Sequence, residues 1–175
     1  AFHEALNLAS LYDLPLVTII ENNQYAMGTA VDRASSEPDL FKQALSYDMP
    51  AALVSGMDVF SVKKGVHDHA EMAREGQPSL LEIRTYRYQG HSISDPAAYR
   101  KEGELDDRKS EDAIVRLQRY LVANDIATED ELDAIDDELK QVVLDAIDFA
   151  EASDFPDESE LYDHVYAQDD YRFLN

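Results

Sequence analysis

The chain has 175 residues, enough for one domain or for one domain with an extension, and 45% of them are hydrophobic, as in proteins with a packed core. The formal net charge of −22 argues against binding to nucleic acid or to an anionic membrane surface. Because there is no cysteine, disulfides and thiolate chemistry are excluded, and a metal would need oxygen or imidazole ligands. No apolar run reaches the roughly 18 residues of a membrane span, and nothing resembles a signal peptide, so we expect an intracellular protein without a membrane partner.

The first part of the chain alternates helix-like and strand-like patterns. An opening helix is predicted to end near Asp13. It is followed by the apolar, β-branched run 16–20, which is typical of a strand buried on both faces of a parallel sheet. A loop over 21–38 and a short helix that Asp39 can cap come next, and then a strand near 51–55.

The pattern continues with a helix that Asp58 is expected to begin and Gly76 to end. Residues 79–86 form the third predicted strand. Strands separated by helices of this length indicate right-handed βαβ units and therefore an α/β fold with a parallel sheet. A long loop is predicted over 87–109, and loops of that length in compact domains are usually functional or disordered.

The remainder of the chain is predicted to be acidic and helical. Ser110 precedes one amphipathic helix, and Thr128 with Glu131 has the T-x-x-E pattern of a capping box at the start of a second. The predicted organisation is an α/β part over 1–100, which includes the long loop's first residues, followed by an acidic helical extension and tail over 101–175.

Ligands of parallel α/β sheets bind beyond the carboxyl ends of the strands, so the loops that follow the strands are the candidate sites. The loop after the first strand reads Glu21-Asn22-Asn23-Gln24-Tyr25-Ala26-Met27-Gly28. Side-chain amide oxygens and backbone carbonyls suit Mg²⁺ or Ca²⁺ when phosphates and a carboxylate supply the charge. An Asn pair also makes ordinary turns with Asx hydrogen bonds, and spacing alone favours that alternative.

The loop after the third strand offers an imidazole, hydroxyls, a carboxylate and a guanidinium. It reads Arg87-Tyr88-Gln89-Gly90-His91-Ser92-Ile93-Ser94-Asp95-Pro96. Such a cluster could bind phosphate or a small acid, or it could be a surface loop in which Asp95 and Ser94 bond to nearby backbone. No P-loop, G-x-S-x-G or H-E-x-x-H pattern is present, so nucleotide hydrolysis, serine-hydrolase and zincin chemistry have no support.

Three motifs in this order resemble a known family, the alpha subunit of the thiamine-diphosphate-dependent decarboxylase component of 2-oxo acid dehydrogenase complexes. The resemblance covers essentially the whole chain, and its third motif is similar to the pyruvate dehydrogenase branch. The motifs are Glu21-Asn22-Asn23-Gln24-Tyr25-Ala26-Met27-Gly28-Thr29, Val54-Ser55-Gly56-Met57-Asp58, and Thr85-Tyr86-Arg87-Tyr88-Gln89-Gly90-His91-Ser92-Ile93-Ser94-Asp95-Pro96 with Tyr99-Arg100.

The resemblance implies roles for four residues. Asn23 would bind Mg²⁺ through its side-chain oxygen, and Tyr25 through its backbone carbonyl. His91 would lie beside the diphosphate of thiamine diphosphate and the substrate channel, with Ser92 next to it as the second catalytic candidate. The family's Gly-Asp-Gly motif, which carries the charged Mg²⁺ ligand, is expected upstream of Ala1, so this chain alone would be inactive.

The resemblance also implies an activity and partners. The reaction would be oxidative decarboxylation of pyruvate, with acyl transfer to a lipoyl group on an acyltransferase component. A beta subunit would complete the cofactor site in an α₂β₂ assembly. The expected location is the bacterial cytoplasm, with the mitochondrial matrix left open. Branched-chain 2-oxo acids or acetoin remain alternative substrates, and a non-catalytic acidic helical interaction module is the more distant alternative.

Overall fold

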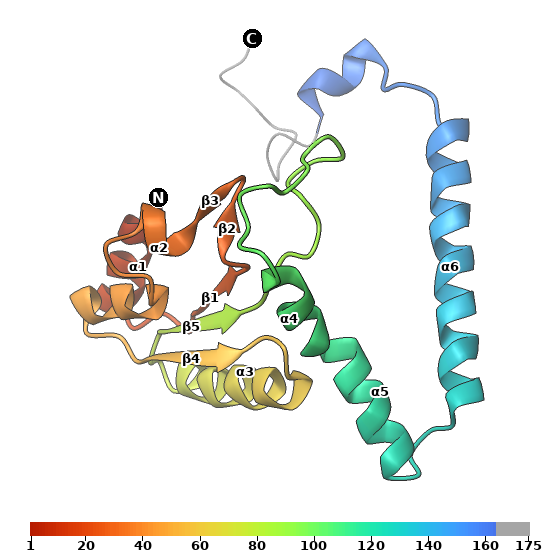
Figure 1. Ribbon diagram of the computed structural model, residues 1–175. Coiled ribbons are helices and arrows are strands. Elements are labelled where there is room, and N and C mark those ends of the chain that lie inside the picture. The colour runs from red at the N-terminus through yellow and green to blue at the C-terminus, as the bar shows by residue number, and fades with distance from the viewer. Residues whose placement is uncertain (164–175) are drawn as a thin grey trace. The chain divides into compact units, whose positions relative to one another are not determined.

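A computed structural model of the chain describes residues 1–163. Three parallel strands form its sheet in the order β1-β5-β4: β1 spans Val17–Asn22, β4 spans Ala51–Ser55 and β5 spans Ser79–Arg84. Helix α3, Val59–Arg74, connects β4 to β5 (Figure 1). The predicted parallel α/β sheet is therefore confirmed, and its strands fall close to their predicted positions.

The middle strand carries the core, because both of its faces are covered. On one face Leu80 packs with Leu6, Ala44 and Met49 in a buried cluster. These residues come from α1, Phe2–Leu11, from the 3₁₀ helix η1, Leu40–Tyr47, and from the loop after it. On the other face Leu81 meets α3, where a Cβ on Gly65 would stand 3.0 Å from Cγ1 of Val54 and 3.5 Å from Leu81. The absence of a side chain at Gly65 lets the helix approach the sheet closely.

The prediction that strand 16–20 is buried on both faces is wrong for this structure. Ile19 is 45% exposed, and within residues 1–163 β1 pairs with β5 along one edge only. The apolar β-branched run predicted the strand correctly, but it is β5 that is covered on both faces and along both edges. Asp39 also differs from its prediction, since its carboxylate makes no capping hydrogen bond to η1.

Both predicted loops contain regular structure. Residues 21–38 include a small antiparallel hairpin, β2 at Tyr25–Ala26 and β3 at Thr29–Ala30, followed by the single-turn helix α2, Val31–Ala34. The predicted loop 87–109 ends earlier, because α4 spans Glu104–Ser110. The acids in the first turn of α4 favour that start by interacting with the positive end of the helix dipole.

The later helices begin at clear caps. Helix α5, Ala113–Ala123, is capped by Asp112 rather than by Ser110: the Asp112 carboxylate accepts from the N–H groups of Ile114 (2.9 Å) and Val115 (3.0 Å). Helix α6, Glu129–Ala152, has the predicted capping box, in which the Thr128 N–H donates to Glu131 at 2.8 Å. A short 3₁₀ helix, η2, follows at Glu158–Tyr162.

Contacts divide the chain into one unit over Ala1–Ile126 and a second that starts at Ala127. The strands, the candidate loops and α4 all belong to the first unit. None of the helices in the described part of the chain is long and apolar enough to cross a membrane.

Candidate functional site

The turn that follows β1 is built from two consecutive Asx hydrogen bonds. Oδ1 of Asn22 accepts from the Gln24 N–H at 3.0 Å, and Oδ1 of Asn23 accepts from the Tyr25 N–H at 3.1 Å. Gln24 takes a left-handed conformation with φ of 74°, which reverses the chain into the hairpin. The Asx turn is thus present, and it holds the Asn23 oxygen and the Tyr25 backbone in one short segment at the carboxyl end of the strand.

A buried carboxylate supports this turn from below. Glu82, in the middle of β5, is fully buried and accepts hydrogen bonds from Nδ2 of Asn22 (2.8 Å) and from the Phe41 N–H (2.9 Å). Arg84 forms an ion pair with it at 2.9 Å and a second one with Asp39 at 3.1 Å. Because every buried polar group in this cluster has a partner, Asn22, the first residue of the turn, is fixed to the core.

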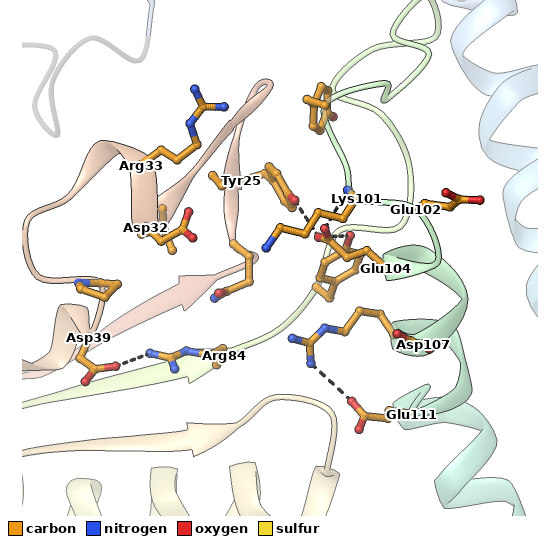
Figure 2. Close-up of a pocket in the computed structure, with 17 residues that line it drawn as sticks. Tyr25, Asp32, Arg33, Asp39, Arg84, Lys101, Glu102, Glu104, Asp107 and Glu111 are labelled. Carbon is orange, nitrogen blue, oxygen red and sulfur yellow. Dashed lines mark hydrogen bonds and ion pairs between the residues drawn. The ribbon is translucent and has the colours of Figure 1, made fainter.

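A second carboxylate anchors the hairpin through tyrosines. Oε1 of Glu104 accepts from the hydroxyls of Tyr25 (2.7 Å) and Tyr86 (2.9 Å), and Figure 2 shows Glu104 pointing toward Tyr25. Burial, together with the bond to the Glu104 carboxylate, raises the pKa of Tyr25 to about 12, and the same causes raise the pKa of Tyr86. The Tyr25 hydroxyl in turn lowers the pKa of Glu104. At neutral pH the tyrosines are therefore donors and Glu104 is a charged acceptor.

Two arginines hold the loop after β5: Arg87 bonds it to the hairpin, and Arg100 bonds to carbonyls within the loop itself. Arg87 donates to the Met27 carbonyl (2.6 Å) and to the Tyr99 hydroxyl (2.8 Å). Arg100 donates to the carbonyls of Tyr88 (2.6 Å) and Gln89 (2.9 Å). The structure thereby brings the two candidate loops together.

The tip of that loop is organised by one carboxylate. Asp95 accepts from the His91 N–H (2.7 Å), the Ala97 N–H (2.8 Å) and the Tyr99 hydroxyl (2.9 Å). The hydrogen bond from the His91 N–H, followed by that from Ala97, lowers the pKa of Asp95. His91 and Ser92 are exposed, and the Ser92 hydroxyl lies 3.1 Å from that of Ser94. The imidazole of His91 is therefore accessible to a ligand.

A cleft of about 610 Å³ lies between the hairpin and α4 (Figure 2). Of the four predicted site residues it is lined by Tyr25 alone; Asn23, His91 and Ser92 are not among its lining residues. The structure thus places Asn23 with Tyr25 in the turn, and His91 with Ser92 at the loop tip. Within residues 1–163, no three His, Asp or Glu side chains form a group that could hold a metal ion.

Sequence reasoning missed the supporting residues. Glu82 carried a readable signal, because an acid inside an otherwise apolar strand needs a buried partner. Arg100 was named in the third motif but without a role, and the bonds of Glu104 to Tyr25 and Tyr86 gave no comparable signal, since those tyrosines lie 79 and 18 positions away in the sequence. Asp95 was assigned to local backbone bonding as one alternative, and that bonding is what the structure contains.

Comparison with known proteins places the chain in a family. Residues 1–159 match the family model described as "Dehydrogenase E1 component". Two bacterial relatives are both called pyruvate dehydrogenase E1 component subunit alpha: that of Rickettsia conorii is 43% identical over 94% of this chain and 51% of its own length, and that of Rhizobium meliloti is 45% identical over 93% and 47%. A rice relative, called pyruvate dehydrogenase E1 component subunit alpha-3, chloroplastic, is 39% identical over 95% and 39%. The chain spans about half the length of the bacterial relatives.

Proposed function

The chain belongs to the dehydrogenase E1 component family, and we propose that it acts as part of the alpha subunit of a thiamine-diphosphate-dependent pyruvate dehydrogenase. The names of its relatives support pyruvate over branched-chain 2-oxo acids or acetoin. The family match over 1–159 argues against a non-catalytic helical module. The expected partners are a beta subunit and a lipoyl-bearing acyltransferase component, and the bacterial relatives favour a cytoplasmic location.

The observation that carries the proposal is the turn at the carboxyl end of β1. Among residues 1–163, Oδ1 of Asn23 accepts one hydrogen bond, from the Tyr25 N–H, which leaves its second lone pair for a metal. Together with the backbone carbonyl of Tyr25 it offers two neutral hard oxygens in one fixed turn. Mg²⁺ accepts such ligands when diphosphate and a carboxylate supply the negative charge, so the residues present fit a magnesium diphosphate.

The second part of the proposed site is the loop tip. We assign His91 to the diphosphate end of the cofactor and to the substrate channel, with Ser92 beside it. The bond from the His91 N–H to Asp95 fixes the backbone of His91 while the imidazole remains exposed. Thiamine diphosphate, when bound, supplies the electron sink that decarboxylation requires. This chain's residues bind and orient it.

The test is Asn23→Ala in the full-length subunit assembled with its beta subunit. Loss of a metal ligand should weaken Mg²⁺-dependent binding of thiamine diphosphate by at least about tenfold in calorimetric titration, while the unfolding midpoint changes little. Asn7→Ala, the same change at an exposed position of α1, is the matched control and should leave binding unchanged. Parental affinity in the Asn23 variant would contradict the metal role. Turnover of pyruvate, branched-chain 2-oxo acids and acetoin by the parent enzyme identifies the substrate.

A further inference from the structure

Glu104 stands where three segments of the first unit meet. It is the first residue of α4, and it follows Gly103, whose φ of 79° turns the chain into the helix. Its Oε2 accepts from the Lys101 N–H at 3.1 Å, so the carboxylate is fixed to its own helix terminus. Its other oxygen, Oε1, is shared by the hydroxyls of Tyr25 and Tyr86.

The two tyrosines belong to different segments of the proposed site. Tyr25 is in the hairpin after β1, and Tyr86 follows β5 at the base of the loop that carries His91. Their rings meet edge to face, with centroids 6.2 Å apart and an interplanar angle of 88°. The guanidinium of Arg100 lies 5.8 Å from the Tyr25 ring centroid and 5.4 Å from that of Tyr86. Glu104 therefore ties both segments to α4.

Tyr25 is held at both ends as a result. Its backbone N–H donates to Asn23 at 3.1 Å, and its hydroxyl donates to Glu104 at 2.7 Å. The backbone carbonyl of Tyr25 belongs to the same residue, between these two attachments. Hydrogen bonds to an ionised carboxylate are shorter and about twice as strong as neutral ones, so the attachment through Glu104 restrains the residue strongly.

We propose that Glu104 is a positioning residue for the metal site, holding Tyr25 through its hydroxyl so that the Tyr25 carbonyl stays directed at Mg²⁺. This rests on the proposed function, because it assumes that the turn binds the metal. Glu104 itself would not touch the metal. Residues that hydrogen-bond to a metal ligand commonly restrict the orientation of that ligand, and Glu104 would act on Tyr25 in this way.

The variants are chosen to separate the tyrosine bonds from general stability. Glu104→Ala removes every bond of the carboxylate. Glu104→Gln keeps an amide oxygen that can accept from both tyrosine hydroxyls, so the attachment to the tyrosines is preserved. Its NH₂ group then faces the Lys101 N–H, so the hydrogen bond to Lys101 is lost. Asp106→Ala is the matched control, because Asp106 is an exposed acid in the same first turn.

The measurement is Mg²⁺ affinity at saturating thiamine diphosphate in the full-length, beta-paired enzyme, with the unfolding midpoint recorded for each variant. We expect Glu104→Ala to weaken Mg²⁺ binding by about tenfold or more. The Mg²⁺ affinity of Glu104→Gln should stay within about threefold of the parental value, and that of Asp106→Ala should equal it. As a single change, Tyr25→Phe should weaken Mg²⁺ binding. In the Glu104→Ala background it should weaken binding little further, because both changes break the same attachment.

Two outcomes would overturn the inference. If Glu104→Ala lowers the unfolding midpoint but leaves Mg²⁺ affinity at the parental value, Glu104 has only a structural role. If Tyr25→Phe and Glu104→Ala have fully additive effects on Mg²⁺ affinity, Glu104 does not act through the Tyr25 hydroxyl. The Asn23→Ala variant distinguishes these failures from failure of the proposed function. If Asn23→Ala weakens cofactor binding while the Glu104 variants keep the parental Mg²⁺ affinity, the turn binds the metal and Glu104 does not position it.

Discussion

The two candidate loops follow neighbouring strands of one sheet, but they are held in different ways. The turn after β1 is fixed from the protein interior: Asn22 is 6% exposed and bonds to Glu82, which has no exposed surface. The tip of the loop after β5 is fixed from within itself, through Asp95, and its His91 and Ser92 face solvent.

This difference matches the two kinds of work that we propose. A magnesium ligand needs a fixed oxygen, because Mg²⁺ demands nearly ideal octahedral geometry. A loop tip beside a diphosphate and a substrate channel must admit and release ligands, so exposed side chains on a locally organised backbone suit it.

The largest effect should come from Glu82→Ala, which breaks the support of the turn. Removing the carboxylate leaves the buried Asn22 amide and the Phe41 N–H without an acceptor, so we expect a loss of about 3 kcal/mol in the free energy of unfolding, measured by urea denaturation of this chain. Glu21→Ala, at an exposed position of the neighbouring strand, should change it by less than about 0.5 kcal/mol. Equal effects of the two changes would show that the buried cluster does not support the turn.

A charge placed at the loop tip should affect activity rather than stability. Ser92→Glu brings a negative charge close to the proposed diphosphate position, and we expect turnover of the assembled enzyme to fall by roughly a hundredfold. Ser92→Ala removes only a hydroxyl and should retain substantial turnover. If the Glu variant works as well as the parent, Ser92 lies away from the cofactor.

Breaking the cationic attachment of the loop should loosen it locally. Arg100→Ala removes hydrogen bonds to the carbonyls of Tyr88 and Gln89, and we expect limited proteolysis within 87–103 to become about tenfold faster while the turn at 22–26 stays resistant. Arg100→Lys keeps the charge but not the planar fork, so it should restore protection only in part. Full protection in the Lys variant would show that charge alone holds the loop.

The smallest predicted effect is the titration of Asp95. Its carboxylate accepts from the His91 N–H and the Ala97 N–H, and these bonds lower its pKa. The carboxylate therefore stabilises the loop fully at pH values above its usual pKa of 3.8, and this stabilisation is lost as the pH falls through the lowered pKa. The carboxyl carbon NMR signal of Asp95 should therefore titrate below 3.8, and Tyr99→Phe should move the midpoint upward by removing one donor. A midpoint at or above 3.8 would contradict the bonding at the tip.

The parallel sheet and the caps of α3 and α6 could be predicted from the sequence because their signals are local. Asp58 and Thr128 precede their helices directly, and their side chains accept from the N–H groups of Phe60 and Glu131. Apolar runs predicted the strands. The start of α4 was missed because the polar residues before Glu104 read as loop, and its stabilising bonds come from Tyr25 and Tyr86. The Asn23 turn was visible in its motif, whereas its support by Glu82 depends on pairing between β1 and β5, which local pattern does not encode.

The difference between the two loops is tested most directly by amide hydrogen exchange of the full-length, beta-paired enzyme with and without thiamine diphosphate and Mg²⁺. We expect residues 22–26 to be protected in both states, because the core fixes the turn. Residues 90–95 should gain strong protection only when the cofactor is bound. Equal protection of the loop tip in both states, or a turn that exchanges freely until the cofactor is added, would contradict this difference between the loops.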